Sequence, residues 1–179
     1  MNMQKNINIT FPDGNVKSYK TGISGKEIAE SIAKSLAKKA IAVKVNGIQK
    51  DLVDPINVDA SISILTIKNE EGLEIMRHTL TAQVLARAIK NLYPNSKLAI
   101  GPTIENGFYY DFLSTTKISE DDFPRIEQEM KRIISEGYDI KKKLKAKEEC
   151  INIFKERGED YKVDIISNSN QITDFQIYQ

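Results

Sequence analysis

The stretch INITFPDGNVKSY, Ile7 to Tyr19, carries the pattern that decides the fold of the first part of the chain. Ile7, Ile9 and Phe11 alternate with polar residues, and Pro12-Asp13-Gly14 separates them from a second alternating run. Alternation of this kind is typical of a strand with one buried face, and a short turn between two such runs predicts a β-hairpin.

A helix is predicted directly after this hairpin. Ser24 and Glu27 have the spacing of a capping box, in which each side chain bonds the backbone of the other residue. The apolar residues that follow fall on one helical face, which predicts an amphipathic helix of about four turns. These residues are Ile28, Ile32, Ala33 and Leu36.

Short strands complete the first part. Residues 41–45 and 62–67 alternate, and Asn46-Gly47 is a strong tight-turn dipeptide. A small sheet and one helix can bury their apolar faces only against each other, so this order predicts a β-grasp fold. The polar stretch Lys68 to Gly72 indicates a boundary near Glu71, with domains at 1–70 and 71–179. The fold class is α+β.

The second part has a more helical pattern. We expect a helix that ends at Tyr93-Pro94, because proline disfavours helical geometry in the residue before it, then a tight hairpin within 98–112. Further along we predict a helix from Ser119 to Gly137, a lysine-rich solvated connector, a short helix near 148–157, and strands at 161–166 and 175–179. Because a strand-like segment stands at residue 179, we expect more sequence after it.

Composition excludes several classes of protein. The formal charge is +1, from 26 basic and 25 acidic residues, so no global field attracts nucleic acid. One cysteine and one histidine leave no disulfide framework and too few ligands for an ordinary structural zinc site. Glycine-rich phosphate-binding loops are absent, which argues against ATP binding. No segment is long and apolar enough to suggest export or membrane insertion, so we expect a cytoplasmic location.

Several motifs carry a family resemblance. FPDG at 11–14, the capped helix and VNG at 45–47 resemble a TGS domain, the β-grasp module at the N-terminus of threonyl-tRNA synthetases. The second part resembles the editing domain that follows it in the bacterial enzymes. The motifs that carry this second resemblance are RH at 77–78, TAQVLARAIKNLYP at 81–94, AIGPTIENGFYYDF at 99–112 and FKERGEDYKV at 154–163.

The resemblance implies an N-terminal portion of such a synthetase, with a TGS domain and an incomplete editing domain that we expect to be inactive in the isolated chain. In the family, the editing domain hydrolyses serine wrongly attached to tRNA for threonine, because a site that admits threonine cannot strongly exclude serine. The class II catalytic core and the anticodon-binding domain of the family have no counterpart here. We therefore expect no aminoacylation by this chain alone, and ATP, magnesium and zinc would belong to the absent core.

The resemblance assigns catalytic positions to His78 and Gln83. The family has two histidines in an H-x-x-x-H pattern, and Gln83 matches the second, with the interval one residue longer. If the helix starts before His78, five α-helical steps turn Gln83 about 140° away. If Thr81 is the N-cap, the extra residue lies in a loop and Gln83 can still face the pocket. In either case glutamine cannot titrate near neutral pH as imidazole does.

Substrate-binding positions are assigned by the same resemblance to Gly101, Tyr110 and Lys162. Each has a structural alternative: Gly101 as part of a turn, Tyr110 as an aromatic packed on the sheet, and Lys162 as a solvated strand residue. Cys150 does not replace the family's later C-x-x-x-H segment, and we expect it to be a small core residue.

Three functions stay open at this point. The first is a portion of a threonine–tRNA ligase that contacts tRNA-Thr and works with a separate chain carrying the remainder. The second is a stand-alone hydrolase of Ser-tRNA(Thr). The third is a non-enzymatic TGS module that binds RNA or a nucleotide. The lysines at 141, 142, 143, 145 and 147 could touch RNA phosphates, although no aromatic residues interleave with them for base stacking.

Overall fold

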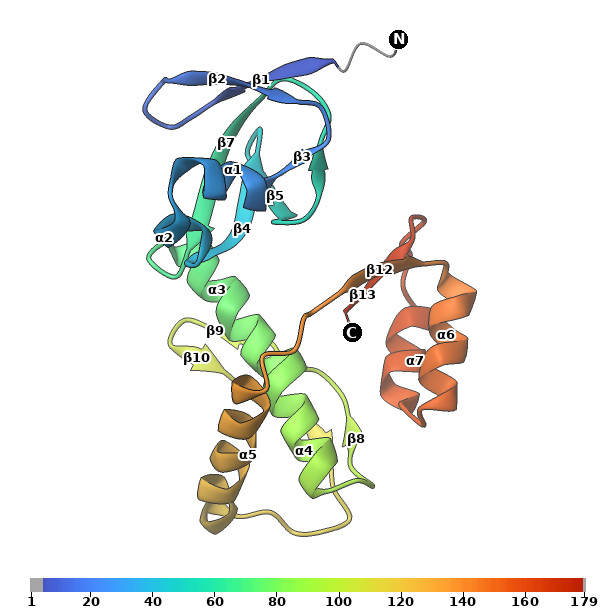
Figure 1. Cartoon of the computed structure of the whole chain (residues 1–179). Helices are drawn as coiled ribbons and strands as arrows, with labels where there is room; N and C mark the ends of the chain where they lie inside the picture. The colour runs from blue at the N-terminus through green and yellow to red at the C-terminus, as the bar shows by residue number, and fades with distance from the viewer. Residues whose placement is uncertain (1–4, 179) are drawn as a thin grey trace. The chain divides into compact units, whose positions relative to one another are not determined.

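The computed structural model describes residues 5–178. Its contacts divide the chain into two units, Met1–Met76 and Arg77–Gln179. Helix α3 (Glu70–Thr79) belongs to both, since the division falls within it (Figure 1). The domain boundary predicted between residues 70 and 71 lies at the start of this helix and stays a prediction.

The first unit is built on a five-stranded sheet with the strand order β2-β1-β7-β4-β5. β1 and β7 pair in parallel, and the other neighbours pair antiparallel. With its helices against this mixed sheet, the unit confirms the predicted β-grasp fold. The elements are β1 (Asn6–Thr10), β2 (Val16–Lys20), β3 (Ile23–Ser24), α1 (Gly25–Ile32), α2 (Lys34–Ala37), β4 (Ala40–Val45), β5 (Ile48–Asp51), β6 (Pro55–Ile56) and β7 (Ala60–Thr66).

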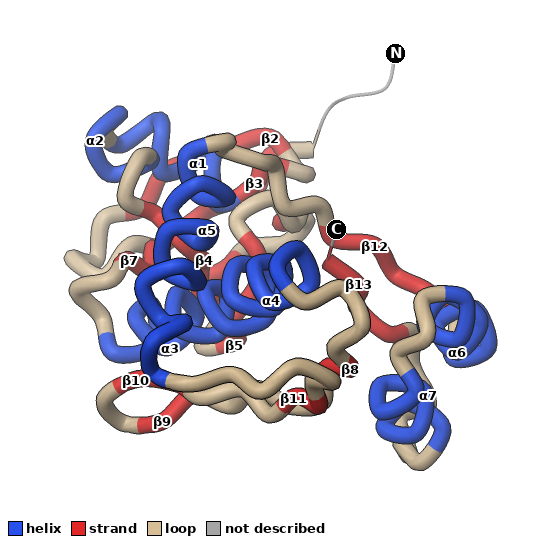
Figure 2. The backbone as a smooth tube through the Cα atoms, turned by 90° about the horizontal axis from the view of Figure 1, so that it is seen from below, coloured by secondary structure: helices blue, strands red, loops and turns tan. Residues whose placement is uncertain are grey.

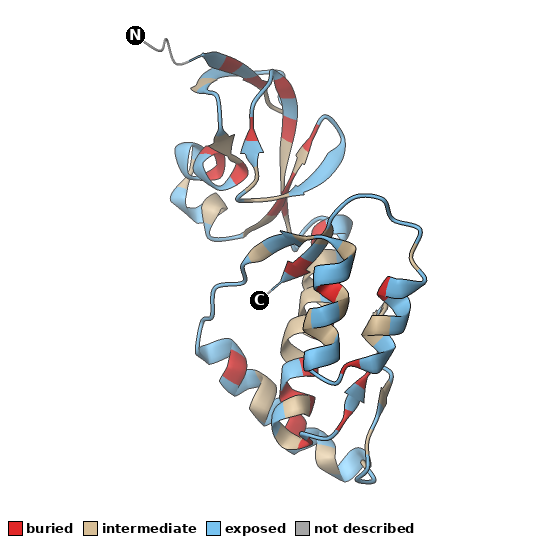
Figure 3. Ribbon diagram, turned by 90° about the vertical axis from the view of Figure 1, so that its right-hand side faces the viewer, coloured by how far each residue is buried: buried red, intermediate tan, exposed pale blue. Residues whose placement is uncertain are grey.

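Helix α1 closes the core of this unit by packing on the sheet (Figure 3). Gly25 begins the helix and is buried against β4, where a Cβ atom would lie only 2.7 Å from Val43 Cγ1. A side chain at this position would therefore push the helix off the strand. The core residues are Ile7, Ile9, Ile28, Val43, Val45, Ile56, Ala60 and Ile62.

The start of α1 confirms the predicted capping box. Ser24 accepts a hydrogen bond from the Glu27 backbone, and the Glu27 carboxylate accepts from the Ser24 backbone at 2.8 Å. The predicted four-turn helix is wrong in length, because Ala33 adopts an extended conformation (φ −163°, ψ 137°) and separates α1 from α2. Consequently Ile32 is 44% exposed instead of lying in the core. No residue here forbids a helix, so local propensity does not predict the break.

Gly25→Ala should lower the free energy of unfolding by about 1–3 kcal/mol, because overpacking against Val43 outweighs the better helix propensity of alanine. Urea denaturation would measure the change. Lys26→Ala, at the next and exposed position, is the matched control and should leave the midpoint nearly unchanged. Equal midpoints for the two variants would contradict the close packing of Gly25 on Val43.

The second unit is largely helical, with short strand pairs between the helices (Figure 2). Helix α3 continues without a break into a π-helical segment and then into α4. The elements after α3 are η1 (Leu80–Leu85), α4 (Ala86–Leu92), β8 (Lys97–Leu98), β9 (Thr103–Ile104), β10 (Gly107–Phe108), β11 (Phe112–Leu113), η2 (Glu120–Asp122), α5 (Phe123–Ser135), β12 (Lys142–Lys145), α6 (Lys147–Glu156), α7 (Asp160–Ser167) and β13 (Phe175–Tyr178).

Two apolar clusters hold this unit together. The first joins α4, β8 and α5 through Ala86, Ile89, Tyr93, Leu98 and Ile126. The second joins α6, α7 and β13 through Cys150, Ile166 and Ile177. Ion pairs between Lys90 and Glu159 and between Lys97 and Asp160 link the elements of the first cluster to α7.

Two predictions for this region are wrong. Residues 161–166, predicted as a strand, belong to helix α7, which packs side by side with α6. Their β-branched side chains favour a strand locally, but burial of Ile166 against Cys150 overrides that preference. The lysine-rich connector is instead strand β12, which pairs antiparallel with β13. The predicted strand at the end of the sequence is confirmed over Phe175–Tyr178, and β12 is its partner.

Candidate functional site

The helix that carries His78 begins at Glu70, so the alternative in which Thr81 is an N-cap is wrong. Thr81 lies inside the helix and is fully buried. Its hydroxyl donates a hydrogen bond to the Arg77 carbonyl at 2.8 Å. The sequence has neither proline nor glycine between His78 and Leu92, and the helix continues through this segment.

The extra residue between His78 and Gln83 coincides with π-helical geometry. The Ala86 N–H donates to the Thr81 carbonyl, five residues back, in place of the four-residue step of an α-helix. A π turn takes up one additional residue, so a five-residue spacing need not turn two side chains apart as it does in a regular α-helix. His78 itself is exposed and Gln83 is half-buried.

The segment around Gly101 packs against this π turn. Backbone hydrogen bonds from Ala99 to Asp111 and from Asp111 to Ile100, at 2.9 and 2.8 Å, hold the segment beside Tyr110. A Cβ atom on Gly101 would lie 2.4 Å from both Thr81 Cγ2 and Tyr110 Cδ2. Gly101 is therefore required for close packing and not for a turn with positive φ. Two predicted site positions, Gly101 and Tyr110, are in this way brought together, with Thr81 as a neighbour that the sequence did not mark.

Gly101→Ala should destabilise the second unit by about 1–3 kcal/mol, because the new methyl group has no room between Thr81 and Tyr110. Thermal unfolding would measure the loss. Thr81→Ser removes the clashing methyl but keeps the hydroxyl, so adding it to Gly101→Ala should recover part of the stability. Gly107→Ala is the control, since nothing lies within 4 Å of its Cβ position. Equal effects of the two glycine variants would contradict the packing.

Lys162 lies on α7 next to a buried carboxylate, and not on a strand as the sequence alternative had it. Glu159 is 5% exposed. Its Oε1 is 3.2 Å from Lys90 Nζ, and its Oε2 is 3.9 Å from Lys162 Nζ. We call Lys90, Tyr110, Glu159 and Lys162 the Glu159 cluster.

The pKa values within this cluster reflect burial and charge. The pKa of Tyr110 is raised by burial and by the negative charge of Glu159. Burial lowers the pKa of Lys162, and the positive charges of Arg157 and Lys90 add to this, while Glu159 opposes it. Glu159 therefore influences both Tyr110 and Lys162. An ammonium and a phenol held near one carboxylate can bind an oxygen-rich or ester-containing ligand through charge-assisted hydrogen bonds.

The sequence-predicted residues are thus only partly assembled. Gly101, Tyr110 and Lys162 are linked through direct packing and through Glu159. Among the residues that the structure describes, His78 and Gln83 contribute no hydrogen bond or ion pair to the Glu159 cluster. Sequence reasoning missed Lys90 and Glu159, and the one available signal was that Glu159 stands three residues before Lys162, a spacing that joins side chains on a helix.

Cys150 is fully buried in the cluster of α6, α7 and β13, as the sequence predicted for a core residue. Burial raises the pKa of its thiol, which disfavours the reactive thiolate. Within residues 5–178, no three His, Cys, Asp or Glu side chains are grouped so that they could hold a metal ion. None of the described helices is long and apolar enough to span a membrane.

Cys150 should react with a thiol reagent at least about 100-fold more slowly in the native chain than in denaturant. This factor corresponds to a local opening free energy of about 2.8 kcal/mol. The labelled fraction over time, followed by mass spectrometry, would measure the rate, with Cys150→Ser as the background. Equal rates in the two conditions would mean that the thiol is accessible.

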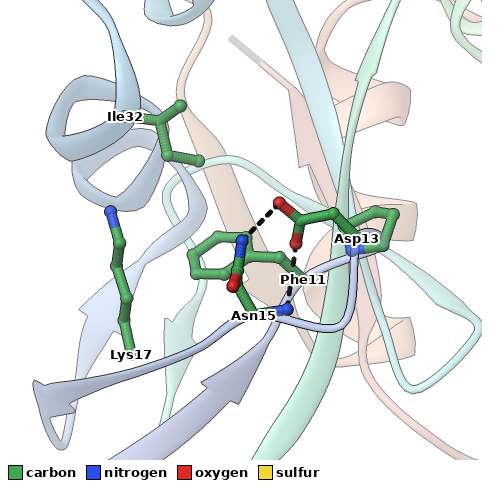
Figure 4. A pocket seen from close by; sticks show the side chains of 6 residues that line it. Phe11, Asp13, Asn15, Lys17 and Ile32 are labelled. Carbon is green, nitrogen blue, oxygen red and sulfur yellow. Dashed lines mark hydrogen bonds between the residues drawn. The ribbon is translucent and has the colours of Figure 1, made fainter.

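A surface pocket of about 360 Å³ lies in the first unit (Figure 4). The Asp13 carboxylate accepts two hydrogen bonds from Asn15, which fix the hairpin turn beside it. None of the five predicted site residues belongs to this pocket. Its lining is Phe11, Pro12, Asp13, Asn15, Lys17 and Ile32.

Comparison with known proteins adds two findings. Residues 7–66 match the TGS domain family. Over nearly its whole length the chain also matches threonine–tRNA ligases. The relative from Allorhizobium ampelinum is 43% identical over 98% of this chain, that from Hyphomonas neptunium 48% over 93%, and that from Clostridium novyi 44% over 97%. The chain spans about a quarter of the length of these ligases, 26%, 26% and 27% respectively.

Proposed function

This chain is homologous to the N-terminal part of threonine–tRNA ligases and carries a TGS domain, and from this premise we propose that it serves threonine–tRNA ligation as the tRNA-contacting and editing portion of such an enzyme. The second unit would receive the 3′ end of tRNA-Thr that wrongly carries serine. Gly101, Tyr110 and Lys162 are three substrate-contact positions assigned by resemblance. The observation that carries this proposal is that Gly101 packs on Tyr110, while the buried Glu159 carboxylate influences both Tyr110 and Lys162.

The proposed chemistry is hydrolysis of a seryl ester. Lys162 and Tyr110 would donate hydrogen bonds to the oxygens of the ester and the terminal ribose, while Gly101 allows the close packing that holds Tyr110 in place. His78 would orient the attacking water. Gln83 can hold a water or the serine hydroxyl by hydrogen bonds, but it cannot accept and release a proton near neutral pH as a second imidazole would. Editing should therefore be slow.

Charging would require the catalytic part of such an enzyme. About three quarters of the length of the relatives has no counterpart in these 179 residues, and we assign ATP, magnesium and zinc to that remainder. We propose that a separate chain supplies it in the cytoplasm. The isolated chain would then bind tRNA-Thr without attaching threonine to it.

The test joins this chain to the part of the Clostridium novyi ligase that follows the matching region. The joined protein should attach threonine to tRNA-Thr, and the isolated chain should not. Gln83→His in the joined protein should raise serine release from Ser-tRNA(Thr) by about 100-fold, the lower end of what a proton-transferring group contributes. Release of labelled serine against time measures this.

Controls separate the proposal from the other functions. Gln128→His introduces the same side chain at an exposed position of α5 and should leave serine release unchanged. A joined protein that charges no tRNA would overturn the proposal. Serine release by the isolated chain above the uncatalysed rate, lost in His78→Ala, would instead favour a stand-alone hydrolase.

A further inference from the structure

Glu159 is a buried acid that pairs with Lys90 through one carboxylate oxygen and has no hydrogen-bond donor at the other among the described residues. It occupies the N-cap position of α7, and its carboxylate accepts no hydrogen bond from the free N–H groups of that helix end. Instead its backbone carbonyl accepts from Lys162 and Val163. Among the described residues, none offers a hydrogen bond to Oε2. Burial of a carboxylate oxygen without a donor is unfavourable, so the arrangement calls for an explanation.

Lys90 fixes the direction of this carboxylate. Its ammonium donates to the Ser96 carbonyl at 2.9 Å and lies 3.2 Å from Glu159 Oε1. Because Lys90 is held by two partners, Oε1 is held as well. Oε2 is then aimed at Lys162, whose Nζ stands 3.9 Å away, outside hydrogen-bonding distance.

The Lys162 ammonium lies between two possible partners, the Phe154 ring and the Glu159 carboxylate. Its Nζ lies 5.4 Å from the centre of the Phe154 ring, within the range of a cation–π contact. A shift of about 1 Å toward Glu159 would form a charge-assisted hydrogen bond of ordinary length. The charged ammonium can thus either bond the Glu159 carboxylate or stay over the Phe154 ring.

We propose that Glu159 is the positioning residue for Lys162, holding its ammonium beside the buried carboxylate at the start of α7. The role of Lys162 as a contact for the substrate rests on the proposed function. The coupling of the two side chains does not, because it depends only on residues within this chain. Glu159 acts through Lys162 and touches no reacting atom.

The charges around Lys162 determine the sign of the effect. Burial, Arg157 and Lys90 all lower the pKa of Lys162, and Glu159 alone among its named neighbours raises it. Without the carboxylate, Lys162 would face two cations in a half-buried place and lose its proton more readily. Without Lys90, it would have the carboxylate to itself and keep its proton to higher pH.

The experiment follows the Lys162 side chain by NMR in the full chain with labelled lysine, using Lys162→Arg to assign its signal. Glu159→Gln should move the Lys162 titration midpoint to lower pH by about 1 unit, the size expected when an opposite charge within about 4–6 Å is removed. Asp160→Asn is the matched control, since Asp160 is exposed and pairs with Lys97. It should leave the midpoint in place.

A midpoint unchanged in Glu159→Gln would overturn the proposal. If that variant fails to fold, as circular dichroism would reveal, Lys90→Met decides: the Lys162 midpoint should then rise, and an unchanged midpoint would equally overturn the proposal. No substrate is needed for these titrations. Failure of the joined protein to release serine, with the expected shifts present, would count against the proposed function and leave the positioning role intact.

Discussion

Thr81 and the π turn around it constrain the second unit more than any other feature. A helix from Glu70 to Leu92 must keep Ala86 and Ile89 on its buried face, and a π-hydrogen-bonded segment changes which residues share that face. The Thr81 hydroxyl satisfies the Arg77 carbonyl, whose regular α-helical partner would be the Thr81 N–H. Its methyl group meanwhile lies against Gly101. One buried side chain therefore couples the phase of the helix to the segment that positions Tyr110.

Features set by neighbouring residues could be predicted from the sequence. The capping box of Ser24 and Glu27 formed as expected. The Asn46-Gly47 turn also formed, with both residues at positive φ, 51° and 80°. Each depends on contacts within a few residues, so the local pattern contains all the information. The β-grasp arrangement followed because a sheet and a helix of this size have few other ways to bury their apolar faces.

Features set by distant residues could not be predicted in the same way. Residues 161–166 have the β-branched composition of a strand, yet the place that Ile166 takes beside Cys150 requires a helix. The lysines of β12 are predicted to be solvated because charged residues are normally exposed, but their backbone is paired with β13, 30 to 36 residues away.

The candidate site shows the same limit. Resemblance supplied Gly101, Tyr110 and Lys162, and the sequence has no means of marking Glu159 as buried, since acidic residues after a glycine are usually solvated. Its partner Lys90 comes from α4, nearly 70 residues earlier. The π turn was not predicted either. One sequence alternative assumed a regular α-helix through His78, and the other assumed a loop before Thr81. Neither spacing nor composition distinguishes a π turn from these.

The parallel pairing of β1 with β7 has a consequence for how the first unit forms. Ile9 lies opposite Ala60, and the Asn8 N–H donates to Asp59 across 51 residues. In the sheet, β7 lies between β1 and β4. The β1–β2 pair and the β4–β5 pair are therefore joined only when β7 is in place. During synthesis on the ribosome, the hairpin and α1 would emerge well before the strand that completes their sheet. Closing so long a loop is slow compared with forming a hairpin. We therefore expect the sheet of the first unit to be completed late, once residues up to Thr66 have left the exit tunnel.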